Sequence, residues 1–151
     1  MRHKLVTLAV ILYIATLSSS AYGHHSHPFF YDECKTITIE GRVESVDFKE
    51  PHTQLVLKLD DGTAYTVDWA PLGRLTKDRT IGPAKEALAF GARVAVTGNR
   101  IRPAAQIRER FANFNSEVNP NTVDPISIRR LDDSFSWALP PRTNPPNCDR
   151  K

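Results

Sequence analysis

A mainly β fold, closed into a small barrel, is predicted by three features of the sequence. Apolar and polar residues alternate along several short runs, and turn residues separate these runs. One stretch has a proline near its start and a glycine after its end, as helices often do. A strand with this pattern buries one face, and closing the sheet removes the unpaired edges that an open sheet leaves exposed. We therefore expect closure instead of an open sheet.

The first strand is expected over residues 35–49, "KTITIEGRVESVDFK". Ile39 and Val43 share one face, but the next apolar residue, Val46, has the opposite parity. A strand that changes face midway usually contains a β-bulge, and a glycine inside it, here Gly41, marks a sharp bend. These features predict a long, coiled first strand.

A β-hairpin is predicted over residues 53–70, "TQLVLKLDDGTAYTVDWA". Asp61 and Gly62 supply the turn, and apolar residues alternate on both sides of it. The expected inward positions are Leu55, Leu57 and Leu59 before the turn and Tyr65, Val67 and Trp69 after it.

The later half predicts a short helix and the remaining strands. In "GPAKEALAFG" Pro83 lies near the first helical position and Gly91 follows the end, with a further turn expected around residues 72–77. A fourth strand is expected in "ARVAVTGN", residues 92–99, and one or two closing strands in "ISIRRLDDSFSWAL", residues 126–139. Strand, hairpin, helix, strand, strand is the order of a five-stranded OB-like barrel with one short helix.

Residues 1–23 predict a signal peptide. Arg2 and Lys4 precede an apolar or small run of 13 residues, which is shorter than the roughly 20 residues that a membrane-spanning helix needs. Cleavage fits either after Gly23 or after Ala21. Export to the periplasm or the cell exterior is expected, without stable membrane insertion once the signal is removed. The mature chain would hold the barrel over residues 24–139, with a possible insertion at 104–125, and a Pro- and Asn-rich tail over 140–151.

The net charge argues against a nucleic-acid partner, and the cysteine content predicts a disulfide. Removing Arg2 and Lys4 from the 20 basic residues leaves 18 against 17 acidic residues, a net charge of +1. No nucleic-acid partner is expected from this balance. Cys34 and Cys148 are the only cysteines, and export would favour a disulfide between them. Two unpaired thiols are the alternative.

Histidines crowd the mature start of the chain. Export would leave His24, His25, His27 and His52, all within the first part of the domain. Neutral imidazole suits copper, zinc and nickel, and an N-terminal histidine adds its own amine as a second nitrogen. Such a set favours Cu(II), and binding would weaken below about pH 6 as imidazoles gain protons. A mobile, solvated N-terminus is the alternative for the first three histidines, and a turn residue after Pro51 is the alternative for His52.

The other candidate residues give no evidence of a catalytic site. Trp69 and Trp137 occupy alternating strand positions and are expected in the core. The arginines of the later half, Arg100, Arg102, Arg108, Arg110, Arg129 and Arg130, suggest an anionic partner that the mature charge does not support. No phosphate-binding glycine loop, HExxH motif or nucleophile elbow is present in the sequence.

Several segments together resemble the exported bacterial proteins of domain of unknown function family 6152. They are "HHS" at the mature start, "GRVESVDF", "PHTQLVLKLDDG", "VDWA", "GARVAVTGN" and "ISIRRLDDSFSW". The resemblance covers residues 24–98 and resumes near Ile126, and it implies a periplasmic OB-like barrel without an assigned activity. His24, His25, Ser26, Pro51 and His52 are the matching residues.

The chain departs from the family pattern at four places. Glu50 stands where the family usually has Asn, and it is either an additional carboxylate ligand or a surface change. Ser134 replaces a usual glycine in the closing turn, residues 104–125 look inserted, and the tail with Cys148 looks peculiar to this chain.

Three hypotheses for function follow. The first is an exported protein that binds a transition metal, copper favoured and zinc or nickel as alternatives, through His24, His25 and His52 with His27 in reserve. The second is a non-metal adaptor or ligand-binding module that holds an envelope protein or an anionic envelope component. The third is a copper oxidoreductase, for which the sequence identifies neither an open coordination position nor a substrate surface.

Overall fold

The computed structural model describes residues 27–141, 146 and 148. The predicted signal peptide, His24 and His25 lie outside these residues. The elements in chain order are α2 (His27–Phe30), β1 (Tyr31–Asp47), β2 (Gln54–Lys58), β3 (Ala64–Asp68), α3 (Leu72–Lys77), α4 (Ile81–Ala87), β4 (Arg93–Ile101), α5 (Ala104–Arg110), β5 (Thr122–Arg130) and β6 (Ser136–Ala138).

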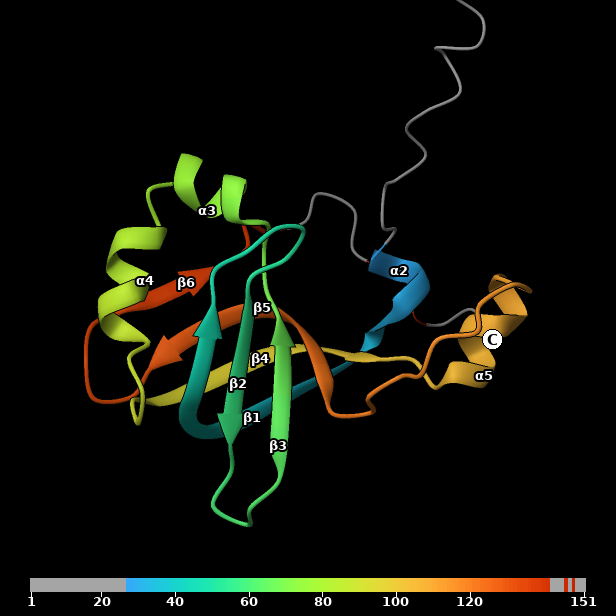
Figure 1. Cartoon of the computed structure of the whole chain (residues 1–151), viewed down its shortest axis with the longest axis horizontal. Helices are drawn as coiled ribbons and strands as arrows, with labels where there is room; N and C mark the ends of the chain where they lie inside the picture. The colour runs from blue at the N-terminus through green and yellow to red at the C-terminus, as the bar shows by residue number, and fades with distance from the viewer. Residues whose placement is uncertain (1–26, 142–145, 147, 149–151) are drawn as a thin grey trace, which may run out of the picture.

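The strands form one sheet that closes on itself (Figure 1). Its order is β3-β2-β1-β4-β5-β6, and a parallel pairing of Thr66 with Thr122 and Val67 with Val123 joins β3 to β5. The closed ring therefore runs β1-β2-β3-β5-β4, which confirms the mainly β, OB-like barrel. β6 pairs with the outer side of β5 and supplies the second of the closing strands expected over residues 126–139.

Strand β1 is long and coiled, as predicted, because it must pair with two neighbours in turn. Its first part pairs with β4 and its last part with β2, and the register shifts between Val43 and Ser45 where a bulge lies. A side chain at Gly41 would come within 2.8 Å of the Lys58 carbonyl oxygen, so the bend requires glycine there. β1 begins at Tyr31, four residues earlier than expected.

The hairpin of β2 and β3 is confirmed, with Gln54 paired to Asp68 and Lys58 paired to Ala64. Leu55, Leu57 and Val67 are fully buried, while Leu59 and Tyr65 are only partly buried because they lie near the hairpin turn. Gly62 has a φ of 86°, which glycine adopts without steric cost.

Two helices, not one, connect β3 to β4. The segment expected as a turn is helix α3, and α4 begins at Ile81, so that Pro83 falls within its first turn, where an N–H donor is not needed. Leu75 of α3, Ala84 and Ala87 of α4, and Leu88 after it are buried against the barrel. The burial of both helices explains why the apolar residues here lack the period of a strand.

The region expected as an insertion, residues 104–125, contains α5 and also the start of β5. β5 begins at Thr122 instead of near Ile126. Its register against β4 shifts between Thr97 and Gly98, and Pro125 lies at this irregularity, where a missing N–H is tolerated. Because proline is rare inside strands, the residues of β5 up to Pro125 are not recognisable as a strand from the sequence alone.

The tail is tied to the barrel. Cys34 and Cys148 form the predicted disulfide, with Cα atoms 5.5 Å apart. Trp69 is buried in the core, as expected, and Trp137 of β6 is partly buried and packs edge-on against it with ring centroids 5.2 Å apart. Within the part of the chain that the structure describes, no helix is long and apolar enough to cross a membrane.

Candidate functional site

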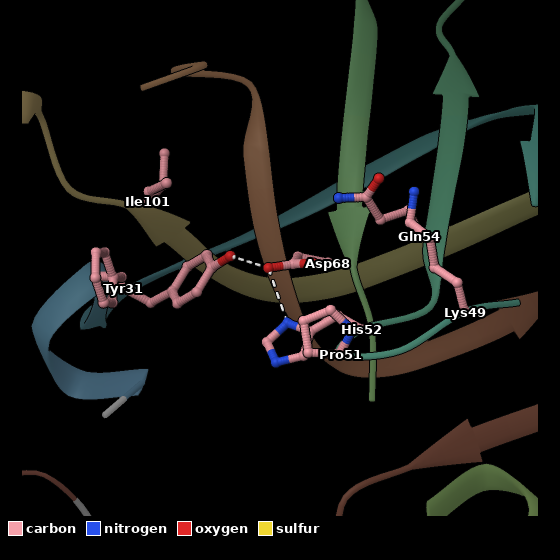
Figure 2. Close-up of a pocket in the computed structure, with 8 residues that line it drawn as sticks. Tyr31, Lys49, Pro51, His52, Gln54, Asp68 and Ile101 are labelled. Carbon is pink, nitrogen blue, oxygen red and sulfur yellow. Dashed lines mark hydrogen bonds and ion pairs between the residues drawn. The ribbon is translucent and has the colours of Figure 1, made fainter. Parts of the chain in front are cut away.

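Three side chains meet at one corner of the barrel, next to α2 (Figure 2). The Tyr31 hydroxyl donates to Asp68 Oδ2 over 2.8 Å. His52 Nδ1 lies 3.1 Å from the same oxygen. We call Tyr31, His52 and Asp68 the polar corner. A single carboxylate oxygen at the end of β3 thus receives one group from the start of β1 and one from the β1–β2 turn.

The strand pattern places Asp68 in the polar corner. Along β3 and just beyond it, Val67 and Trp69 point into the core and are almost fully buried, so the residue between them points outward. Asp68 ends β3, where the parallel register with β5 brings it near Asp124, which is buried. Two carboxylates consequently lie on neighbouring strands at this end of the barrel.

His52 is fixed by the backbone on both sides. Thr53 donates its N–H to the Ala70 carbonyl over 3.2 Å, and its own carbonyl accepts from the Trp69 N–H over 2.8 Å. Before the cis Glu50–Pro51 peptide bond, the Glu50 carboxylate accepts from the Gly73 N–H over 2.7 Å at the start of α3. Glu50 therefore holds the turn against α3 in this structure, which gives the departure from the family's Asn a structural role.

The electrostatics of the polar corner keep Tyr31 protonated. Burial raises the pKa of its hydroxyl far above the ordinary value of 10.0, and the negative charge of Asp68, the hydrogen bond to it and the charge of Asp124 raise this pKa further. Tyr31 is therefore a hydrogen-bond donor to Asp68 and not a phenolate.

The same carboxylate selects a tautomer of His52. A carboxylate can only accept hydrogen bonds, so the ring nitrogen that faces it, Nδ1, carries the proton. In the neutral ring the lone pair is then on Nε2. This is the orientation that second-shell carboxylates impose on metal-binding histidines.

A cavity of about 380 Å³ adjoins the polar corner. Its walls come from the end of α2, the β1–β2 turn, β2, β3 and the end of β4. They are formed by Phe30, Tyr31, Lys49, Pro51, His52, Gln54, Asp68 and Ile101. The cavity thus brings the end of α2 and His52 to one place.

Helix α2 is short but well anchored. The Phe30 carbonyl accepts from the Arg102 N–H over 2.7 Å, and the Arg102 guanidinium contacts the Pro28 carbonyl at 3.4 Å and Asp32 at 3.5 Å. The Phe30 ring stacks on Phe111 with centroids 5.8 Å apart and meets Phe114 edge-on at 6.0 Å. The segment after α5 therefore serves to hold α2 against the barrel.

The predicted metal ligands fall into three groups. His52 lies in the polar corner. His27 begins α2. His24 and His25 lie outside the described residues, so the structure does not bring them together with His52. Among residues 27–141, 146 and 148, no three His, Cys, Asp or Glu side chains are grouped as ligands for a metal ion.

Sequence reasoning missed Tyr31 and Asp68. Tyr31 belongs to the aromatic run at residues 29–31, which carries no signal of a polar site, and Asp68 occupies an outward polar position on an alternating strand. The available signal was the Asp in "VDWA", because it lies between two core residues at the end of a strand. Its nearness to His52 depends on the closure of the hairpin, which positions Gln54 opposite Asp68.

Comparison with known proteins gives solved structures of similar fold and one family. The fold is similar to a chain in the crystal structure of the S. pombe Stn1–Ten1 complex, with 18% sequence identity and a TM-score of 0.44 over 65% of this chain and 59% of that chain. The match thus spans less than two thirds of that chain. No curated protein matches the sequence. The model of the Family of unknown function (DUF6152) matches residues 11–108, more than half of the 151 residues, and the chain belongs to this family.

Proposed function

We propose that the mature, exported protein binds a transition metal, copper in preference to zinc or nickel, at the polar corner. The ligands would be the amine and ring of His24, the ring of His25 and Nε2 of His52, with His27 in reserve. The observation that carries this proposal is the Asp68–His52 pair, which lies on the same cavity as the end of α2.

The pair supplies one ligand in a prepared state. A metal binds the deprotonated nitrogen of a neutral imidazole, and Asp68 stabilises the tautomer in which Nε2 is that nitrogen. Asp68 is itself held by the Tyr31 hydroxyl, which stays protonated. The ring of His52 is therefore oriented before any metal arrives.

The proposal requires the nitrogens of His24 and His25 to reach the cavity beside His52. An extended chain spans at most about 3.5 Å per residue, so the three residues from His24 to His27 would allow a reach of about 10 Å from the first residue of α2. Four residues after that first residue, Tyr31 contacts Asp68. Arg102 and the phenylalanines anchor α2 beside this cavity, which supports choosing His24 and His25 as the proposed partners of His52.

The donor set favours copper. An α-amine and imidazole nitrogens form a nitrogen-rich set, which suits the tetragonal geometry of Cu(II). Zinc and nickel bind the same donors, and Zn(II) would accept them in a tetrahedral arrangement. Copper is thus the metal to test first.

Titration calorimetry with Cu(II) on protein whose first residue is His24 tests the proposal. His52→Ala should lower the affinity by about 10- to 100-fold, the range seen when a metal site loses a ligand or its support. Gln54→Ala is the matched control, because this residue lines the same cavity without being a proposed ligand. Equal copper affinity in His52→Ala and Gln54→Ala would exclude His52 as a ligand.

A non-metal adaptor is the second candidate, and the surface beside α2 supports it. Phe29 and Phe111 are 37% and 39% exposed, their rings are 4.9 Å apart, and Arg108 and Arg110 lie on the adjoining helix α5. Exposed aromatic and arginine side chains are enriched in protein interfaces. Joint substitution of His24, His25 and His52 should leave capture of an envelope partner intact, whereas Phe111→Ser should weaken it.

A further inference from the structure

The cavity beside the polar corner has an uneven lining, of which the metal proposal uses only Tyr31, His52 and Asp68. Figure 2 shows Ile101 and Tyr31 on one side, Lys49 and Gln54 on the opposite side, and the His52–Asp68 pair between them. One side thus offers apolar contact, and the other offers hydrogen-bond donors. A cavity of this size, about 380 Å³, is within the range of sites for small organic ligands.

The apolar side is supported by aromatic packing. It includes Tyr31 and Ile101 (Figure 2), and the ring of Phe30, which also lines the cavity, packs against Phe111 and Phe114. Aromatic and aliphatic walls of this kind attract a compact apolar group through the removal of its surface from water.

The polar side holds charges of both signs. The Lys49 ammonium pairs with Asp47 at 2.7 Å, but these side chains are 47% and 60% exposed, and such pairs contribute little. The ammonium can therefore exchange Asp47 for another anion at small cost. The Gln54 amide adds N–H donors, and the Asp68 carboxylate supplies a negative charge at the border between the two sides of the cavity.

We propose that this cavity binds a zwitterionic amino acid with an apolar side chain. Its carboxylate would lie near Lys49 and Gln54, its ammonium group near Asp68, and its side chain against Phe30 and Ile101. A ligand with only one charge would interact with only one of the two charged side chains, Lys49 or Asp68. This function goes beyond metal binding and does not require a metal, so each can fail without the other.

NMR titration of the metal-free mature protein, kept in a chelator, tests the proposal. L-leucine is the probe, and 4-methylpentanoate and 3-methylbutylamine are its analogues without the ammonium group and without the carboxylate. L-leucine should shift the amide signals of Gln54, Asp68 and Ile101, and each analogue should bind about tenfold more weakly, as expected for the loss of one charged hydrogen-bonding group.

Two lysines on or beside β2 provide matched variants. Lys49→Gln should weaken L-leucine binding about tenfold and leave 3-methylbutylamine binding unchanged, because only the carboxylate loses its partner. Lys58→Gln, at the other end of β2 and outside the cavity, should change neither. The absence of L-leucine shifts, equal binding of the three probes, or the same affinity in Lys49→Gln as in Lys58→Gln would overturn the proposal.

Discussion

The interior of the barrel and the polar corner both include residues of β3, yet different kinds of interaction hold them together. In β3 and just after it, Val67 and Trp69 belong to the core and Asp68 belongs to the polar corner. The interior is held by non-directional apolar burial, in which one side chain can often replace another of similar volume. The polar corner depends on three particular groups that meet at one carboxylate oxygen.

We therefore expect the interior to determine the stability of the fold and the polar corner to determine what the protein binds. Substitutions in the interior should lower the free energy of unfolding strongly and affect ligands only through unfolding. Substitutions in the polar corner should cost less stability but change what the corner can bind. The predictions that follow test this division.

The largest loss of stability is expected in the interior. Leu57→Ala removes a fully buried side chain and should lower the free energy of unfolding by about 3 kcal/mol, through lost burial and the cavity that remains. Denaturant unfolding measures this change. Phe90→Ala, at a side chain that is 85% exposed, is the control and should change stability by less than about 0.5 kcal/mol. A similar loss in both variants would contradict the assigned core.

Loss of the disulfide should come next. Replacing Cys34 and Cys148 together by Ser releases a bridge between residues 114 positions apart and should lower the free energy of unfolding by about 2 to 4 kcal/mol. Thermal unfolding with and without reductant measures it. The double variant should be insensitive to reductant, and a wild-type chain with the same insensitivity would show that the bridge contributes nothing.

Asp68→Asn should separate the two regions most clearly. The amide can offer an N–H to the ring of His52 and so no longer selects its tautomer, and copper affinity should fall by about tenfold or more. Because Asp68 lies outside the core, the free energy of unfolding should fall by only about 1 to 2 kcal/mol. Calorimetry and denaturant unfolding on one preparation give both values, and an unchanged copper affinity would remove Asp68 from the site.

The smallest expected effect is the alkaline behaviour of Tyr31. The pKa of its hydroxyl is raised on folding, so the unfolded chain releases this proton above about pH 10 while the folded chain keeps it. Its stabilising contribution is therefore complete below pH 10 and is lost as the pH rises above it. Tyr31→Phe should flatten part of the fall in stability between pH 9 and 11, and equal slopes in both proteins would contradict the buried hydrogen bond.

Most of the fold followed from period-two alternation. Leu55, Leu57 and Val67 are buried where the pattern placed them, and Gly41 lies at the predicted bend. The failures have physical causes. Pro125 hid the start of β5 because it lies at a register irregularity, and α3 was expected as a turn because its six residues are too few to show a helical period.

The candidate site was less predictable because its residues are distant in the sequence. His52 was identified from its type and its place in a turn, but Tyr31 and Asp68 are 37 positions apart. No local pattern reports such a contact, which depends on barrel closure and on the packing of α2 by Arg102 and Phe111. The Cys34–Cys148 bridge was predictable because the chain offers only one pairing.

A double-mutant cycle on copper affinity tests most directly whether the processed N-terminus and His52 share one metal. The four proteins begin at His24 or carry one extra leading residue, each with His52 or with His52→Ala, and titration calorimetry gives the four affinities. If both groups bind the same ion, the loss caused by one change depends on the other, with a coupling of about 1 kcal/mol or more. Additive losses, or no loss in any variant, would contradict a shared site.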